Sequence, residues 1–256
     1  MAACSLLLAD DLKSGSVVVV VPAESGPPVD ASDPSPAHDV GPDAPNVDER
    51  LLGWWPFAEI DGSTTPDVSG HGHVATLTGD AVITPDGPHG GRSVRVSGAG
   101  TVAVASLAGA AFPRTGTLSF WFRYETMTAA AHVGIFDIWD TKRKHLYFRH
   151  ANDSPADAFQ FALQQEGSGV AYAFAANPKI ARATWTHIAL VWDTDAARAS
   201  CFVDGALVGE GTYGSAFVPS AQHFELGLYL DGAIGEIRLY DRPLGAIEIG
   251  ALASGQ

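Results

Sequence analysis

The sequence is short of basic residues and of long apolar runs, and each shortage narrows what the protein can be. Lys and Arg number 15 against 29 Asp and Glu, which gives a net charge of −14, and the longest basic run is residues 142–144. Phosphate binding depends on clustered Lys and Arg, so nucleic acid is not an expected partner. The run of five valines at 17–21 falls far short of the roughly 18 apolar residues of a transmembrane helix.

Cysteine is also scarce, because only Cys4 and Cys201 occur in 256 residues. Cys201 lies inside a predicted strand and Cys4 in a predicted flexible terminus, so we expect no disulfide between them. Cys201 is expected to be a small, buried, apolar residue.

Recognisable catalytic signatures are missing. A retaining glycosidase needs two carboxyls about 5–5.5 Å apart, which alternate positions of one strand can supply. Three acidic pairs come closest to that spacing, and all read as solvated surface: Glu59 with Asp61, Asp193 with Asp195, and Asp137 with Asp140. Gly-x-Ser-x-Gly, His-Glu-x-x-His and a glycine loop for phosphate are absent. We therefore expect a protein that is not an enzyme.

The features that are present are those of a β protein. The 28 glycines and 16 prolines suit many turns. Residues 185–192 and 200–203 read as two strands of a hairpin, and a tight Asp204-Gly205 turn leads into a third strand at 206–209. Trp185 and Trp192 are seven positions apart and should face opposite sides of the strand. His187 could be a catalytic base, but no nucleophile context accompanies it, so packing beside a tryptophan is favoured.

Further short strands are expected along the rest of the chain, at intervals of 8–15 residues without a helical pattern between them. The predicted strands are residues 51–57, 73–78, 81–84, 93–96, 101–105, 117–124, 129–138, 145–150, 158–164, 170–175, 224–230 and 235–240. Residues 61–72 read as a loop, and a short helix is expected near residues 244–252. Trp54 and Trp55 are adjacent and should point to opposite faces. This pattern predicts an antiparallel two-sheet sandwich.

Residues 1–49 read as a disordered tether. Seven prolines and no aromatic residue occur in residues 22–47, and such a segment cannot bury enough apolar surface to offset its ordering entropy. The small residues that end at Cys4 are similar to the cleavage end of a bacterial lipoprotein signal, which makes Cys4 a candidate lipidation site. Only three residues precede Cys4, so either the natural start lies upstream or the similarity is accidental.

A family resemblance is carried by motifs that occur in a fixed order. They are LGWWPF (52–57), DVSGHG (67–72), GRSVRV (91–96), FWF (120–122), WTHIALVWD (185–193), FVDGALVG (202–209), DGAIGEIRLY (231–240) and RPL (242–244). Together they resemble bacterial LamG-like jelly-roll domains, relatives of laminin G and of concanavalin A-like lectins. The resemblance covers about residues 51–252, and we assign residues 50–254 to this domain.

The resemblance implies calcium as a candidate cofactor, with Asp67 of the D-x-S-G loop as its candidate ligand. The family's closing motif customarily carries Asp where this sequence has Gly235, and Glu236 or Asp231 could substitute for it. The alternative for Asp67 is that its side chain caps its own turn. His71 and His73 could share a zinc ion, but the sequence supplies no further ligand.

The resemblance also implies a function. We expect an exported, surface-tethered binding module for carbohydrate or glycoprotein, attached to the outer membrane if Cys4 is lipidated. Tyr213, Tyr229 and Trp139 are candidate exposed aromatics, but the sequence nominates no sugar site. A structural or protein-adhesion module without sugar binding, or a hydrolase or lyase on the same fold, remain the alternatives.

Overall fold

The computed structural model of the protein describes residues 48–104, 107, 113–126, 132–139, 145–151, 158–165, 169–176, 180–193, 195–212 and 223–255. All of them belong to a unit that spans Asp43–Gln256. Cys4 and the predicted tether, apart from Asp48 and Glu49, lie outside the described residues. Within those residues, no helix has the length and apolarity to cross a membrane.

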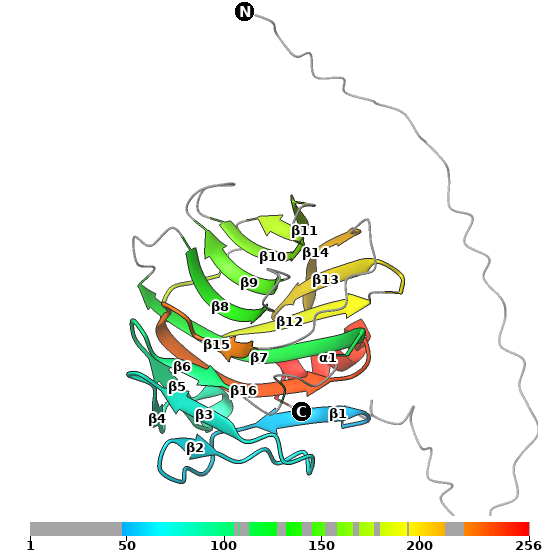
Figure 1. Ribbon diagram of the computed structural model, residues 1–256. Coiled ribbons are helices and arrows are strands. Elements are labelled where there is room, and N and C mark those ends of the chain that lie inside the picture. The colour runs from blue at the N-terminus through cyan, green and yellow to red at the C-terminus, as the bar shows by residue number, and fades with distance from the viewer. Residues whose placement is uncertain are drawn as a thin grey trace, which may run out of the picture. The chain divides into compact units, whose positions relative to one another are not determined.

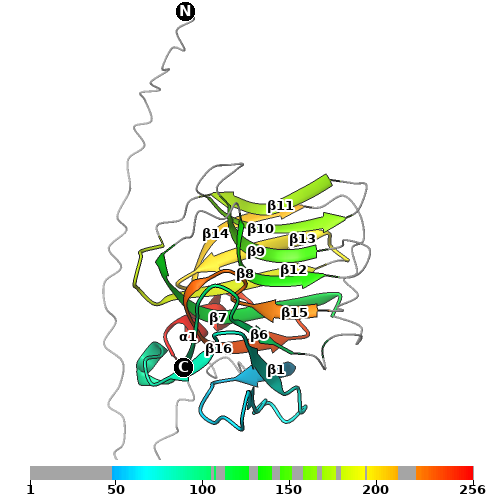
Figure 2. The same cartoon turned by 60° about the vertical axis from the view of Figure 1, so that its left-hand side comes forward.

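Two antiparallel sheets of eight strands each form the fold (Figures 1 and 2). Sheet A runs in the order β14 (Ala206–Thr212), β13 (Arg198–Val203), β12 (Thr186–Asp193), β7 (Thr115–Thr126), β16 (Asp231–Tyr240), β5 (Ser93–Val96) and β4 (Val82–Thr84), and β1 (Leu51–Trp55) pairs with the far half of β16. Sheet B runs in the order β11 (Gly169–Ala176), β10 (Ala158–Gln165), β9 (His145–Ala151), β8 (His132–Trp139), β15 (His223–Leu226), β6 (Thr101–Ala103), β3 (Ala75–Thr78) and β2 (Thr64–Thr65). The predicted two-sheet sandwich is therefore confirmed.

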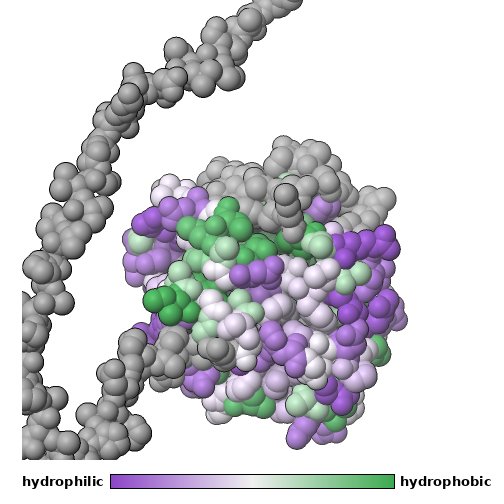
Figure 3. Space-filling view, turned by 180° about the vertical axis from the view of Figure 1, so that it is seen from behind, coloured by the Kyte–Doolittle hydropathy of each residue, from purple (hydrophilic) through white to green (hydrophobic). Residues whose placement is uncertain are grey.

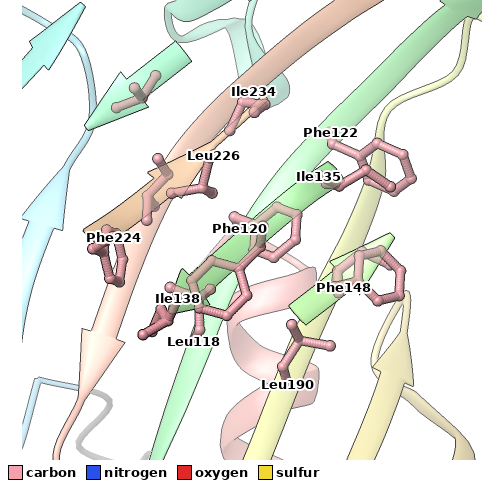
Figure 4. Packing of buried hydrophobic residues seen from close by; sticks show 14 of the residues in the cluster. Leu118, Phe120, Phe122, Ile135, Ile138, Phe148, Leu190, Phe224, Leu226 and Ile234 are labelled. Carbon is pink, nitrogen blue, oxygen red and sulfur yellow. The ribbon is translucent and has the colours of Figure 1, made fainter. Parts of the chain in front are cut away.

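The core lies between the two sheets and follows from the alternation of apolar residues along each strand. Leu118, Phe120 and Phe122 of β7 are fully buried there, and Phe148 of β9 lies across from them with its ring 6.3 Å from those of Phe120 and Phe122 (Figure 4). The central pairing joins β7 to both β12 and β16. The predicted meander β12–β13–β14 forms one end of sheet A.

A second, smaller apolar cluster covers the outer face of sheet A. It consists of Leu51, Ala189, Phe202, Tyr240, Leu244, Ile249 and Leu252. The last two belong to the predicted C-terminal helix, α1 (Ala246–Ala253). Glu248 fixes the start of this helix, because its carboxylate accepts the Gly245 N–H at 2.8 Å and pairs with Arg242. Figure 3 views the molecule from behind, where a larger group of apolar residues lies in the upper part of the surface and smaller apolar spots lie among polar residues elsewhere.

The predicted tryptophan orientations are confirmed. Trp55 and Trp192 are buried in the main core, whereas Trp54 packs against the outer cluster. Trp185 lies just before β12, half-buried, with the Arg123 guanidinium 5.1 Å from its ring. Odd spacing along a strand thus sends neighbouring tryptophans to opposite faces, as expected.

Several expectations about strand extents were wrong, and the strand expected at 235–240 begins at Asp231. Residues 61–72 were expected to be loop throughout, but Thr64–Thr65 pairs with β3 as a short strand. The strand expected at 224–230 ends at Leu226, because Gly227 and Tyr229 take positive φ values of 91° and 64° and close a turn there.

Candidate functional site

A cleft of about 350 Å³ lies beside β1, where the chain enters the domain. It is lined by Asp48, Arg50, Leu51, Trp54, Val68, Ser69 and His71. One wall is β1 with the residues just before it, and the other is the loop formed by residues 66–73, here called the Asp67 loop. Ligand sites in proteins commonly enclose about 300–1,000 Å³, so this cleft is large enough for a small ligand.

Asp67 holds the Asp67 loop against β1. Its Oδ1 accepts the backbone N–H groups of Trp54 and Ser69, both at 2.8 Å, and its Oδ2 accepts that of His73 at 3.0 Å. Val68 N–H also donates to the Trp54 carbonyl at 2.9 Å. The predicted turn-capping role of this side chain is therefore present in the structure, and it extends across to β1.

These contacts keep the carboxyl of Asp67 ionised. Partial burial by itself would raise its pKa, but the hydrogen bonds donated by Trp54, Ser69 and His73 outweigh burial and hold the pKa below the ordinary value of 3.8. At neutral pH the Asp67 loop therefore carries an ionised carboxylate whose oxygens accept backbone N–H groups.

The other wall is anchored by Arg50, which takes a positive φ of 59°. Its Nε and Nη2 donate to the two carboxylate oxygens of Asp241 at 2.7 and 3.0 Å. Hydrogen bonding to Asp241 raises the pKa of the Arg50 guanidinium, so this group is cationic throughout the accessible pH range. A planar bidentate pair of this kind fixes orientation as well as distance.

Trp54 lines the cleft and also packs against the outer cluster. Its ring lies 4.4 Å from the Arg238 guanidinium, while the residue also lines the cleft. Its backbone N–H is the one that Asp67 accepts. Trp54 therefore places part of an aromatic side chain beside Arg50, Ser69 and His71, and sugar rings bind to such combinations of apolar and polar groups.

The candidate calcium ligands lie apart from one another. Glu236 pairs with Arg238 at 3.1 Å, and Asp231 accepts from Thr126 at 2.6 Å and lies 3.4 Å from Arg95. Gly235 packs its backbone against Pro88. In the part of the chain that the structure describes, no three His, Cys, Asp or Glu residues group as metal ligands would. Asp67 as a calcium ligand stays a prediction that these observations do not test.

The histidine pair of the Asp67 loop is stacked. The rings of His71 and His73 are 6.4 Å apart and nearly parallel. The carbonyl of His73 accepts the Trp55 indole N–H at 2.6 Å, which ties the loop to the main core. His71 lies at the surface on the cleft wall, where it can meet a ligand.

His187 is packed beside a tryptophan as expected, but a serine that the sequence did not indicate accompanies it. Its ring lies 5.2 Å from that of Trp121, and its Nε2 is 2.8 Å from Oγ of Ser119. His187 is fully buried, and burial lowers its pKa to about 3, helped by the charges of Arg238 and His89. The imidazole is therefore neutral and enclosed in the folded domain.

On the outer face of sheet B, strand pairing brings two carboxylates together. Asp137 of β8 lies directly opposite Glu225 of β15, and both side chains are half-buried. Tyr147 is the partner of Asp137 on the other side, and Arg149 lies 4.4 Å from its ring while donating to Gln160 at 3.0 Å. The sequence search for paired acids missed this arrangement because it considered single strands only.

The candidate exposed aromatics have separate outcomes. Tyr229 is 51% exposed at the turn after β15. Tyr213 and the side chain of Trp139 lie outside the described residues. Trp54, which forms part of the cleft, was not among the three, because its exposure depends on a loop that the sequence alone does not place.

Comparison with known proteins gives a family. The family model of the concanavalin A-like lectin/glucanase superfamily matches residues 95–250, which is more than half of the chain. A search of curated proteins gives no match.

Solved structures share the fold. Domain 4 of an extracellular arabinanase from Geobacillus stearothermophilus, in complex with arabinotriose, superposes with a TM-score of 0.65 at 18% identity, over 80% of this chain and 98% of that one. A structure of botulinum neurotoxin type C, whose cell entry depends upon interaction with two ganglioside molecules, gives a TM-score of 0.65 at 12% identity. The binding domain of Paraclostridial mosquitocidal protein 1 gives 0.62 at 11%.

The two toxin chains are longer than the region that matches. Each match covers 82% of this chain, but the chain spans only about half of the toxin structures, 52% and 53%. At these identities the likeness shows the fold, and what the relatives bind is a property of those proteins.

Proposed function

Because the chain belongs to the concanavalin A-like lectin/glucanase superfamily, we propose that it is a non-catalytic binding module whose ligand is a carbohydrate or a glycoconjugate. The observation that carries this proposal is the cleft between β1 and the Asp67 loop. Similar structures of arabinotriose-binding and ganglioside-dependent proteins support the ligand class.

The residues of the cleft supply the two kinds of contact that sugars need. Trp54, with Leu51 and Val68, offers apolar surface on which the C–H face of a pyranose or furanose ring packs. Arg50, Ser69 and His71 can orient hydroxyl groups by hydrogen bonding. The domain's excess of acidic residues disfavours polyanionic ligands, because like charges raise the cost of approach.

The experiment is a glycan array probed with the full-length chain and two variants. Trp54→Ala removes the aromatic wall of the cleft. Trp185→Ala is the matched control, because Trp185 is also half-buried with an arginine beside its ring, but it does not line the cleft. We expect binding that Trp54→Ala abolishes and Trp185→Ala preserves. An equal loss of glycan binding in both folded variants would show that the cleft is not the binding site.

Calcium belongs to the same proposal, with Asp67 as its ligand. The array is therefore run with calcium and with a chelator. Binding that disappears on chelation and returns with added calcium supports a calcium-dependent lectin. Binding that does not change on chelation supports a lectin that does not need calcium, and it leaves Asp67 with its structural role alone.

Export and surface tethering complete the proposal, and they rest on the sequence alone. Cys4 is the proposed lipidation site, and the lipid on Cys4 is the proposed anchor to the outer membrane. Expression of the natural gene with radiolabelled palmitate tests this: label that is incorporated in the natural protein and lost in Cys4→Ser supports a lipoprotein. Unlabelled protein would leave residues 1–49 as a plain tether.

A protein-adhesion or structural role is the first alternative. A blank array with a folded protein favours it. The exposed apolar residues Leu207 of β14 and Ile247 of α1 would then be the first positions to substitute in a test of protein binding.

Hydrolysis is a second candidate that one observation favours. Directly opposite residues of an antiparallel pair hold their Cβ atoms about 4.5–5.5 Å apart, so Asp137 and Glu225 can approach the carboxyl separation of a retaining glycosidase. Incubation of the full-length chain with array-positive oligosaccharides, followed by a reducing-end assay, tests this directly. Product formed by the natural chain and abolished in Glu225→Gln would make the protein an enzyme.

A further inference from the structure

A small chamber lies beneath the C-terminal helix, on the outer face of sheet A. Its volume is about 10 Å³, and it is lined by Ser119, Trp121, Glu236, Arg238, Leu252 and Gly255. The first four come from β7 and β16, and the last two from α1 and the turn that follows it. The chamber is separate from the cleft, with which it shares no lining residue.

Arg238 lines this chamber and carries a buried donor. Its side chain is largely enclosed, because the residue is only 9% exposed, and its Nη2 donates to Glu236 at 3.1 Å. Its Nε–H is buried and has no acceptor within the part of the chain that the structure describes. Buried donors in native proteins almost always have an acceptor, from protein or from an ordered water.

The backbone of β16 is distorted beside the chamber. A bulge between Gly235 and Arg238 shifts the register of β16 against β7, and Glu236 takes a positive φ of 49° within it. Such a conformation is costly for a residue other than glycine and persists only where the surroundings impose it. Glu236 and Arg238 both line the chamber, and Arg238 lies opposite Ser119 in the pairing of β16 with β7.

Ser119 adds a second polar group with spare capacity. Its Oγ is 2.8 Å from Nε2 of the buried His187. A hydroxyl has one donor and two acceptor positions, so this bond leaves Ser119 able to make another.

We propose that the chamber is a binding site for a single water molecule, which accepts the Nε–H of Arg238 and bonds to Ser119 and Glu236. The volume decides the ligand: a cavity of about 10–15 Å³ holds one water, and a sugar or a hydrated ion does not fit. With partners on two strands, the water has the two to four bonds that a buried water requires. It joins the Glu236–Arg238 pair to the Ser119–His187 pair.

The bound water also affects the cleft. The Arg238 guanidinium lies 4.4 Å from the Trp54 ring, so whatever fixes the orientation of Arg238 also fixes the support of that ring. This consequence rests on the proposed function of the cleft, whereas the water site does not.

The test is nuclear magnetic resonance of the full-length chain, with the side-chain Nε–H of Arg238 as the probe. Arg95 is the internal control, because its side chain is 47% exposed. We expect exchange of the Arg238 proton with bulk solvent to be at least about ten times slower than that of Arg95, with a through-space cross-peak to a water of long residence. Exchange as fast as that of Arg95, or a protected proton without a water cross-peak, would overturn the proposal.

Two variants test the site from opposite directions. Leu252→Ala opens the chamber, and we expect the Arg238 proton to exchange faster, while Ile247→Ala on the 79% exposed side of the same helix leaves it unchanged. Ser119→Thr places a methyl group in the chamber and should remove the water cross-peak. A cross-peak that persists unchanged in both folded chamber variants contradicts the site. Because no glycan is involved, failure here leaves the proposed function intact, and a blank array leaves this inference intact.

Discussion

The carboxylate of Asp67 accepts the backbone N–H of Trp54 at 2.8 Å, from a position thirteen residues later in the chain. Together with the bond from Val68 N–H to the Trp54 carbonyl, this bond links the loop on one side of the cleft to the tryptophan on the other. The same carboxylate organises its own loop through Ser69 and His73. Asp67 thus helps to set the shape of the cleft, and substitutions at Asp67 should change both stability and binding.

Asp67→Asn is expected to destabilise the domain by about 1–3 kcal/mol. The backbone N–H groups of Trp54, Ser69 and His73 donate to two carboxylate oxygens of Asp67, whereas an amide side chain has only one oxygen that can accept. Urea denaturation of the natural chain and the variant measures this. Asp61→Asn is the control, since Asp61 is exposed and its side chain has no such role. A loss in Asp67→Asn no larger than in the control would show that the three N–H bonds do not stabilise the loop.

The contribution of Asp67 should depend on pH with a definite sign. Its pKa in the folded domain is lower than the ordinary value of 3.8, so the ionised form is favoured by folding. The stabilisation is therefore fully present above about pH 4 and is lost as the pH falls through the lower, folded-state value. The difference in unfolding free energy between the natural chain and Asp67→Asn should shrink below pH 4. A difference that is constant with pH would place its origin in the shape of the side chain, not in its charge.

His187 should act in the same sense, over a higher pH range. Burial lowers its pKa to about 3, against 6.5 in an unfolded chain. The unfolded state therefore binds an extra proton as the pH falls below 6.5, and the domain loses stability progressively between pH 6.5 and 3, by up to several kcal/mol.

Two measurements check this behaviour. The imidazole carbon shifts of His187 should remain those of the neutral ring at pH 5, and His187→Gln should show a flatter dependence of unfolding free energy on pH over the same range. A titration of His187 near pH 6.5 in the folded protein would contradict the enclosed Ser119–His187 pair.

Two glycines should respond in opposite directions. A Cβ at Gly53 would overlap the Trp55 ring, so Gly53→Ala should destabilise by about 1–3 kcal/mol through displacement of that core tryptophan. A Cβ at Gly250 of α1 meets nothing within 4 Å, so Gly250→Ala should stabilise by about 0.5–1 kcal/mol. Thermal denaturation of both variants measures the two shifts. Shifts of the same sign would show that the close packing at β1 has been misjudged.

Cys201 should be chemically inert while the domain is folded. It is fully buried, and burial raises the pKa of its thiol. A thiol reagent should therefore label it only at the rate of unfolding, and labelling should accelerate with urea. Immediate modification in the native protein would mean that the β12–β13 end of sheet A opens readily.

The sequence predicted the fold because the fold is encoded locally. Alternating apolar residues in β7, the Asp204-Gly205 turn and the helical spacing near Leu252 each act over a few positions, and each is present in the structure. The wrong end of the strand expected at 224–230 depended on Gly227 and Tyr229, whose positive φ values arise from the turn as a whole.

The candidate sites could not be predicted in the same way, because they join distant segments. Ser119 and His187 are 68 residues apart and meet only through the pairing of β7 with β12. Asp137 and Glu225 meet only through β8 and β15. The cleft needs the entry segment, Trp54 and the Asp67 loop together. The motif carrying Asp67 was visible, but its bond to Trp54 was not.

The most direct test of the account is the affinity of the full-length chain for its best array glycan, measured by titration calorimetry for the natural protein, Trp54→Ala and Trp185→Ala. We predict that Trp54→Ala weakens binding at least about tenfold, equivalent to about 1.4 kcal/mol, because central aromatic side chains dominate binding energy. Trp185→Ala should bind as the natural protein does. Undiminished affinity in a folded Trp54→Ala variant would contradict the cleft as the binding site.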